Sequence, residues 1–215
     1  MPKIAAGVEA FRRDGYQKRK DLYGKLAGGQ SPEVLMITCS DSRISPTLIT
    51  SAEPGEVFVI RNAGNIVPPY AEAGGGETAT IEYAVAALKV SHIVVCGHTG
   101  CGAMAAAMDP SGLDALPQVK AWIGHADEAV SKVKDAGGDM RALLRQNALE
   151  QVEHLKSHPY VQKAMEAGEL TLHAWVYDIG EGQVEAHDGD AWKPVAEAYA
   201  DAVSAFAQQV TGQEH

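Results

Sequence analysis

The sequence predicts an α/β fold in which a mainly parallel central sheet is flanked by helices. Short apolar runs bounded by turn residues predict strands that are buried on both faces. Segments with apolar residues three or four positions apart lie between these runs and predict helices. Because the two patterns alternate along the chain, a parallel sheet with crossover connections is favoured.

The first half of the chain contains the clearest strand signals. Three strands are predicted there, at Val34–Cys39, 57–60 and 92–96. Residues 3–27 and 76–89 predict helices, each with its apolar residues on one stripe. Ser45-Pro46 offers an N-cap followed by proline at the first position of a further helix.

The second half is predicted to be mostly helical. Residues 101–168 contain several helical patterns, including Met140–Lys156. A fourth strand is predicted at 170–177, followed by a glycine turn and a short strand at 184–186. Residues 194–209 predict a closing helix, so one α/β domain with helical additions fits the chain better than two domains.

The composition is that of an ordinary globular protein with an acidic balance. The 215 residues include 18 Lys and Arg against 28 Asp and Glu, which gives a net charge of −10. This charge argues against nucleic acid or an anionic membrane as the main partner, because both favour basic surfaces. Neither a signal-peptide core nor a membrane span is evident in the sequence, so we expect a cytoplasmic protein.

The chain contains only three cysteines, Cys39, Cys96 and Cys101. An odd, sparse count in a chain of this length does not describe a disulfide scaffold. It indicates a reducing compartment, in which thiols remain free to bind metal or to react. Cys96 lies inside an apolar strand and is interpreted as a packing residue.

Two polar loops follow predicted strands. Cys39-Ser40-Asp41-Ser42-Arg43 begins at the end of the first strand, and His98-Thr99-Gly100-Cys101-Gly102 follows the third. In open α/β sheets, functional groups collect beyond the carboxyl ends of strands, where the strand order reverses. If the first and third strands are neighbours, with the second strand on the other side, both loops open into one crevice.

Cys39, His98 and Cys101 then converge as two thiolates and one imidazole, a ligand set that suits Zn²⁺. Neither loop offers a fourth protein ligand of similar quality, and three ligands with one open position are typical of a catalytic zinc. Two thiolates cancel the charge of the metal and acidify a bound water less than three histidines do. A neighbouring group is therefore expected to orient and stabilise a zinc-bound hydroxide.

Asp41 and Arg43 fit that role. On an extended segment, positions i and i+2 point to the same face, so the two side chains can form a bidentate pair that keeps Asp41 ionised. Asp41 is then placed to accept the proton of the hydroxide. In the competing interpretation Asp41 is itself the fourth zinc ligand, which blocks the site; the sequence leaves both states open.

Other polar features carry weaker signals. Gly97, Gly100 and Gly102 suggest a phosphate loop, but the lysine of a Walker motif is missing. Of the eight histidines, only His98 lies in a motif, and the others are interpreted as surface residues that leave the proton shuttle unassigned.

The sequence around these motifs resembles the β-class carbonic anhydrases, with the densest similarity over residues 30–105. The matching segments, in family order, are Gln30-Ser31-Pro32, Glu53-Pro54-Gly55-Glu56, Arg61-Asn62-Ala63-Gly64-Asn65, Ile81-Glu82-Tyr83-Ala84-Val85 and Val95-Cys96-Gly97-His98. The chain looks most similar to the subgroup of plant chloroplast enzymes and bacterial enzymes associated with cyanate metabolism.

This resemblance implies specific roles for site residues. One Zn²⁺ per chain is expected on Cys39, His98 and Cys101, with Asp41 and Arg43 as the catalytic dyad. The resemblance also implies five substrate-binding residues, Gln30, Phe58, Ala63, Tyr83 and Gly102. Of these, Gln30 is implied to reach the substrate from the partner subunit. Some relatives carry a larger aliphatic residue in place of Ala63, so a slightly roomier pocket is implied. The implied reaction is the reversible hydration of carbon dioxide to bicarbonate and a proton.

The resemblance also implies an organisation and a partner. A single domain spans 1–215, with an N-terminal helical arm (1–28), a zinc-binding α/β core (30–180) and a C-terminal hairpin and helix (181–215). The arm packs on a partner subunit in a homodimer or higher homo-oligomer. Relatives with an inhibitory bicarbonate site carry tryptophan where this chain has Met36, so we expect no such site and an open metal near pH 7.

Three other functions remain as alternatives. A zinc-stabilised binding module without activity is disfavoured, because both Asp41 and Arg43 are present. A thiol redox enzyme is expected to carry Cys-x-x-Cys, which this sequence lacks. A related hydrolase acting on carbon disulfide or carbonyl sulfide fits the pocket residues less well than carbon dioxide does.

Overall fold

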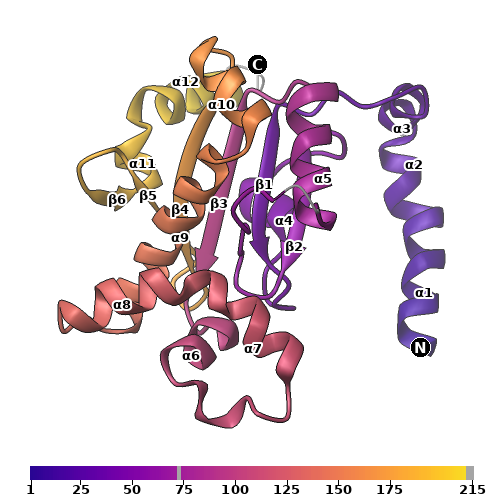
Figure 1. The fold of residues 1–215 in the computed structure, drawn as a ribbon. Coiled ribbons are helices and arrows are strands. Elements are labelled where there is room, and N and C mark those ends of the chain that lie inside the picture. Colours follow the sequence, from indigo (N-terminus) through magenta and orange to yellow (C-terminus); the bar gives the residue numbers. More distant parts are fainter. Residues whose placement is uncertain (72–73, 212–215) are drawn as a thin grey trace.

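The computed structural model describes residues 1–71 and 74–211, and in these a six-stranded sheet forms the centre of the molecule (Figure 1). The strand order is β2-β1-β3-β4-β5-β6. The strands are β1 Val34–Cys39, β2 Val57–Asn62, β3 His92–His98, β4 Thr171–Asp178, β5 Gln183–His187 and β6 Trp192–Pro194. The first four are mutually parallel, whereas β5 and β6 are antiparallel additions. The predicted mainly parallel sheet is therefore confirmed, and β6 is an element that the sequence pattern did not predict.

The strand register brings the ends of β1 and β3 to the same edge of the sheet. Val34 pairs with His92 at the start of both strands, and Thr38 pairs with Cys96 near their ends. On its other side β1 pairs with β2, so the strand order reverses at β1 as the sequence analysis assumed. The loops after β1 and β3 therefore leave the sheet side by side.

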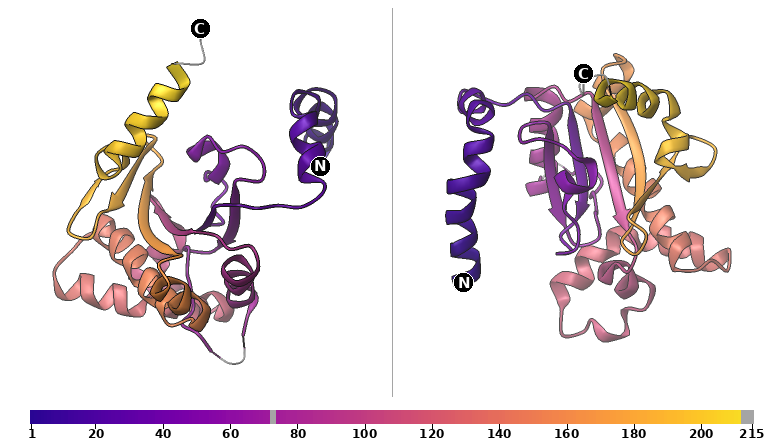
Figure 2. Two further views of the ribbon diagram at one scale, coloured as in Figure 1. Left: turned by 90° about the horizontal axis from the view of Figure 1, so that it is seen from above. Right: turned by 180° about the vertical axis from the view of Figure 1, so that it is seen from behind.

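The two faces of the sheet are covered unequally. Helices α5 (Gly76–Glu82), α9 (Met140–Lys156) and α10 (Pro159–Glu166) lie over one face, as the two views of Figure 2 show. The large hydrophobic core lies beneath them and includes the fully buried Leu35, Ile37, Ile93 and Val95. Strand side chains alternate between faces, so Met36, Val94 and Cys96 point to the other side, where they form only a small cluster. That face carries α4 (Pro46–Thr50), α11 (Val195–Ala198) and α12 (Ala200–Thr211).

The remaining helices complete the body. Three of them, α6 Gly102–Met108, α7 Pro117–Ile123 and α8 Asp127–Asp135, form the lower part of Figure 1. The predicted bounds of α9 are confirmed, and the predicted helix at 76–89 is present but changes to a π-helical turn at Tyr83–Ala87. In the parts of the chain that the structure describes, none of the helices combines the length and apolar character needed to cross a membrane.

The N-terminal arm stands apart from the body (Figure 1). It consists of α1 Pro2–Ala10, a π-helical turn Phe11–Gly15, α2 Tyr16–Lys18 and α3 Lys20–Leu26, and none of these residues is buried. The single helix predicted over 3–27 is therefore wrong in one respect, because Arg19 leaves the helical conformation with φ −120°. At this break the Arg19 guanidinium forms a bidentate ion pair with Glu53 of the body.

A charged cluster joins α9 to β5 on the opposite side of the molecule. Arg145 and Arg141 both donate to the carboxylate of Glu185, whose side chain is 18% exposed. Burial alone raises the pKa of this carboxyl, but the hydrogen bonds from Arg145 and Arg141 outweigh it, and the pKa lies below its usual value. A carboxyl with a depressed folded-state pKa contributes stability above its unfolded pKa and loses it as the pH falls through the folded value.

Glu185→Gln is therefore expected to lower the free energy of unfolding by about 1 kcal/mol at pH 6. The deficit relative to the unchanged protein should shrink as the pH falls below about 4.3, the pKa of an unfolded glutamate. Urea unfolding midpoints at pH 6 and pH 3.5 measure the effect. The exposed Glu181 of the β4–β5 turn provides a matched control, Glu181→Gln, with no expected deficit. A deficit that stays constant across this pH range contradicts the assignment.

Candidate active site

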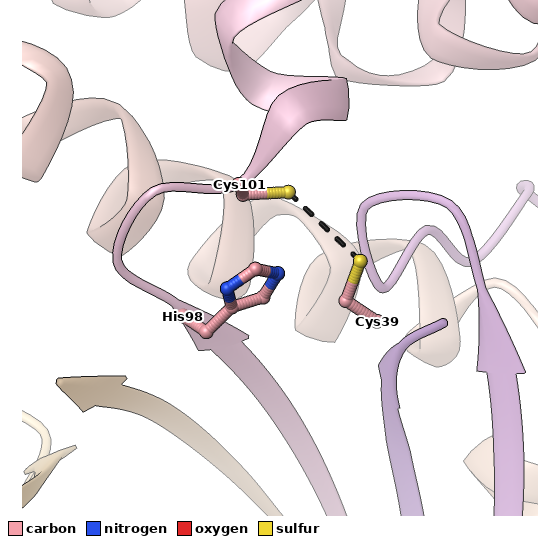
Figure 3. A group of neighbouring side chains, drawn as sticks. All are labelled: Cys39, His98 and Cys101. Carbon is pink, nitrogen blue, oxygen red and sulfur yellow. Dashed lines mark hydrogen bonds between the residues drawn. The ribbon is translucent and has the colours of Figure 1, made fainter. Parts of the chain in front are cut away.

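Three sequence-predicted ligand residues converge beyond the ends of β1 and β3. Cys39 ends β1, His98 ends β3, and Cys101 is the N-cap residue of α6. Their sulfur and nitrogen atoms all lie within 4.8 Å of one another, and all three side chains are buried (Figure 3). The Sγ atoms of Cys39 and Cys101 are 4.0 Å apart. The group could therefore hold a metal ion.

The tautomer of His98 is determined by its surroundings. Nδ1 lies 3.0 Å from the carbonyl oxygen of Thr99, and since a carbonyl only accepts, Nδ1 carries the proton. Nε2 is then left with a free lone pair. This atom is buried and has no hydrogen-bond partner among the described residues. A buried, unpaired nitrogen that faces two cysteine sulfurs is the arrangement expected of a metal ligand.

Cys39 lies in an environment that favours its thiolate form. A hydrogen bond from the Cys101 thiol is the largest cause that lowers the pKa of Cys39 to about 4, and the backbone N–H of Gly64 acts in the same direction. The Gly64 nitrogen is 3.4 Å from the Cys39 sulfur. The thiolate of Cys39 in turn raises the pKa of Cys101. A bound cation stabilises the thiolate form of both cysteines, so metal binding releases protons.

Asp41 and Arg43 form the expected pair, but by a different local geometry. The segment is a turn rather than extended, since the Arg43 backbone N–H donates to Asp41 Oδ1 at 2.9 Å. The turn brings the side chains together, and the guanidinium donates to both carboxylate oxygens at 2.9 and 2.7 Å. These hydrogen bonds hold the pKa of Asp41 well below its usual value, so Asp41 is an anion near neutral pH.

Two arginines tie the loops of the site together. Arg43 also donates to the carbonyl oxygen of Gly100 at 3.0 Å, which links the Asp41 loop to the loop between His98 and Cys101. Gly100 has φ +68°, a conformation that favours glycine at this turn. Arg61 on β2 donates to the carbonyls of Cys39 and Asp41 at 3.0 and 2.7 Å. The sequence analysis did not identify Arg61 as a site residue, although it lies in a segment quoted for the family resemblance.

The predicted substrate residues are only partly assembled within this single chain. The rings of Phe58 and Tyr83 are 6.1 Å apart, and Tyr83 is 49% exposed. Ala63 and Gly102 are exposed. Gln30 is exposed between α3 and β1, and among the contacts of the described residues it makes no hydrogen bond to the ligand group or to the Asp41–Arg43 pair.

The remaining cysteine and one further histidine, His158, are buried. Cys96 is 2% exposed and packs with Met36 and Val94, and burial raises its pKa to about 12, which agrees with a packing role. The interpretation of the other histidines as surface residues is wrong for His158, which is fully buried and hydrogen-bonded to the carbonyl of Pro68. No motif in the sequence marks it, because its partners, the Pro68 carbonyl and the Tyr160 hydroxyl, meet it only in the folded chain.

Comparison with known proteins identifies the family. A profile described as "Carbonic anhydrase" matches residues 34–184, which include all three ligand candidates. The chain belongs to the β-class carbonic anhydrase family. A carbonic anhydrase of Pseudomonas aeruginosa is 48% identical over 194 residues, with 88% of each protein covered. Carbonic anhydrase 1 of Escherichia coli O157:H7 is 47% identical over 194 residues, covering 88% of this chain and 89% of that protein.

Solved structures of β-carbonic anhydrases share the fold. The β-carbonic anhydrase CcaA superposes with a TM-score of 0.87 at 40% identity, covering 91% of this chain and 98% of that one. A β-carbonic anhydrase of the ascomycete Sordaria macrospora, described as tetrameric, has a TM-score of 0.73 at 31% identity, with 89% and 97% covered. Membership of this lyase family makes the chain an enzyme, with carbonic anhydrase activity, the hydration of carbon dioxide.

The geometry of the ligand group gives a direct test. We expect Cys39→Ser to abolish metal binding, because it removes one of two sulfurs from a group with three ligands. Cys96→Ala is the matched control and is expected to retain full metal content, because Cys96 faces the other side of the sheet. Elemental analysis of the purified variants measures both. Full metal content in Cys39→Ser contradicts the ligand assignment.

Proposed function

We propose that this carbonic anhydrase holds one Zn²⁺ per chain on Cys39, His98 and Cys101, and that Asp41, held by Arg43, orients the attacking water. The observation that carries the proposal is the free Nε2 of His98, which faces two cysteine sulfurs while Nδ1 is fixed by a backbone carbonyl. The spacing supports this choice of metal. Two Zn–S bonds of about 2.3 Å at a tetrahedral angle place the sulfurs about 3.8 Å apart, close to the 4.0 Å separation found.

Zinc bound at such a site supplies a Lewis acid that brings the pKa of water from about 15.7 toward neutrality. The protein supplies the orientation of that water. Asp41 is ionised and therefore only accepts hydrogen bonds. Arg43 occupies three of roughly four acceptor positions on the carboxylate. The remaining position, on Oδ2, would accept a hydrogen bond from the water and so direct an oxygen lone pair of the water toward carbon dioxide.

The arrangement favours an open metal site over one closed by Asp41. Coordination of the metal by Asp41 requires its carboxylate to give up hydrogen bonds to the Arg43 side chain and backbone. Arg61, which is engaged with the carbonyls of Cys39 and Asp41, holds the loop in the same position. With Met36 in place of the tryptophan of the bicarbonate-inhibited relatives, we propose that the site stays open near pH 7.

The carbon dioxide pocket is proposed to contain Phe58, Ala63, Tyr83 and Gly102, with Gln30 donating to a substrate oxygen from the partner subunit. Two features support a contribution by a second chain. Gln30 is exposed and lies in the chain between α3 of the arm and β1, and Tyr83 presents half of its surface to solvent. A small neutral substrate needs an apolar wall and one or two donors, which these residues provide.

The assembly is proposed to be a homodimer or a higher homo-oligomer of such dimers. The arm exposes Ile4, Val8 and Phe11, which are 66%, 62% and 48% accessible. The less covered face of the sheet bears a cleft of about 930 Å³, whose lining includes Met36 and Trp175. Exposed apolar surface on both elements is typical of an interface. The arm of a second copy is the occupant that the family resemblance implies.

Three coarser features complete the proposal. The chain is proposed to act in the cytoplasm, where its three free cysteines stay reduced. Its organisation is proposed to be one domain with an arm (1–28), a core (30–180) and a C-terminal hairpin and helix (181–215). Within the family, it is proposed to group with the plant chloroplast and cyanate-associated bacterial enzymes, on the sequence segments quoted above.

Stopped-flow hydration of carbon dioxide with a pH indicator, alongside zinc analysis, tests the function. Asp41→Asn is expected to keep its zinc and to lose kcat by about a hundredfold or more, since the amide no longer provides an anionic acceptor. The exposed neighbour Ser42 gives the control Ser42→Ala, with unchanged metal and rate. One zinc per chain with no hydration from pH 7 to 9 in the unchanged protein refutes the proposal.

The assembly has its own test. Ile4→Asp combined with Val8→Asp is expected to shift the protein to a smaller species, because it places two charges on the apolar stripe of the arm. Ala6→Asp combined with Ala10→Asp adds the same charge on the other side of α1 and should leave the mass unchanged. Light scattering during size-exclusion chromatography measures the mass. Identical masses for both double variants rule out this stripe as the interface.

A further inference from the structure

The segment after β2 contacts one of the three candidate ligands, Cys39, and is hydrogen-bonded to side chains from helices α7 and α9. We call residues 63–68, which run from Ala63 to Pro68, the strap. At its inner side, the Gly64 N–H donates to the sulfur of Cys39 at 3.4 Å. Gly64 has φ +83°, and a side chain there would come within 2.9 Å of Met104 and 3.1 Å of Ala103. The strap therefore approaches the sulfur with its bare main chain.

The peptide that donates to Cys39 is fixed at both ends. The N–H of Gly64 and the C=O of Ala63 belong to the same peptide unit, which is planar. The indole N–H of Trp122, from α7, donates to that carbonyl at 2.8 Å. The next carbonyl, of Gly64 itself, accepts from the side-chain amide of Asn147 on α9 at 3.1 Å. One peptide unit thus joins the indole of Trp122 to the sulfur of Cys39, and Asn147 holds the unit that follows.

Side chains from α9 and from the N-cap residue of α10 form further hydrogen bonds along the strap. Asn147, Gln151 and His154 are four and three residues apart, which places them on one face of α9, and His158 follows as the N-cap residue of α10. We call these four residues the polar row. Asn147, Gln151 and His158 are at most 1% exposed.

Every member of the polar row pairs with main chain of the strap. Gln151 Oε1 accepts from the N–H of Val67 at 2.8 Å, and its amide donates to Asn147 at 3.0 Å. His154 Nδ1 donates to the carbonyl of Val67 at 2.8 Å. His158 Nε2 donates to the carbonyl of Pro68 at 3.1 Å. Buried polar side chains of this kind are costly unless all are satisfied, and a satisfied network rigidifies its surroundings.

We infer that Trp122 and Asn147 are positioning residues for the metal centre, which act by holding the Gly64 N–H on the sulfur of Cys39. The inference rests on the proposed role of Cys39 as a zinc ligand. A hydrogen bond to a thiolate withdraws charge from the sulfur and fixes its direction. Trp122, which holds the carbonyl of the same peptide, also polarises that peptide and strengthens its N–H as a donor, whereas Asn147 fixes the position of the next peptide. Groups that orient ligands in this way commonly change metal affinity by about 10- to 100-fold.

The test compares the rate of zinc release from two variants that lack a hydrogen-bond donor with the rate from a variant that only loses apolar packing. Trp122→Phe keeps an aromatic ring but removes the N–H, and Asn147→Leu keeps the volume but removes the donor. Each is expected to release zinc to a chromogenic chelator about tenfold faster than the unchanged protein. Val161→Ala, a fully buried position on α10, is the control for lost stability and should leave the release rate within about twofold.

Cobalt substitution gives a second readout, which a merely structural role does not move. In both Trp122→Phe and Asn147→Leu, the thiolate-to-cobalt charge-transfer band is expected to shift to lower energy, because a sulfur with a weaker hydrogen bond donates more charge. The band of Val161→Ala should stay in place. Unchanged release rates and bands in both positioning variants overturn the inference while leaving the zinc site intact. Absence of stoichiometric zinc from the unchanged protein instead overturns the proposed function together with this inference.

Discussion

The parallel pairing of β1 with β3 is the constraint on which the rest of the site depends. The shared register places the last residues of both strands at one edge, so Cys39 and His98 meet although 59 positions separate them. The pairing is secured by side chains buried on both strands, and a shift of one residue would turn every one of them to the opposite face. The core therefore fixes the position of these two candidate ligands, and the loops only have to add Cys101 and the Asp41–Arg43 pair.

The site contains several groups that can carry negative charge, and different donors stabilise them. The site contains two cysteine sulfurs and the carboxylate of Asp41, and two of these groups, Asp41 and Cys39, have separate hydrogen-bond donors. Arg43 pairs with Asp41 and reaches across to Gly100, whereas the Gly64 N–H serves the sulfur of Cys39. Because the arginine neutralises the carboxylate rather than the thiolates, the sulfurs remain available to a cation while Asp41 remains an acceptor beside it.

The central strands and the convergence of Cys39, His98 and Cys101 could be predicted because their signals are local. Continuous apolar runs mark β1 and β3, and polar loops after strand ends mark the site. The break at Arg19 could not be predicted, since it accompanies an ion pair with a residue 34 positions away. Strand β6 contains a proline and is three residues long, so it has no strand pattern of its own. The burial of His158 could not be predicted for another reason: it pairs with the carbonyl of Pro68, 90 positions away, and with the hydroxyl of Tyr160, and neither contact leaves a motif in the sequence.

The hydrogen bonds that hold the strap leave some of its side chains free to vary in evolution. The contacts from Trp122 and the polar row reach the strap through its main-chain atoms, which are the same for nearly every residue type. The exposed side chain of Ala63 is therefore free to vary in size, while the carbonyl that it shares with the Gly64 peptide stays in place. The wall proposed for the substrate and the environment of the sulfur can thus evolve independently, although they are built on adjacent residues.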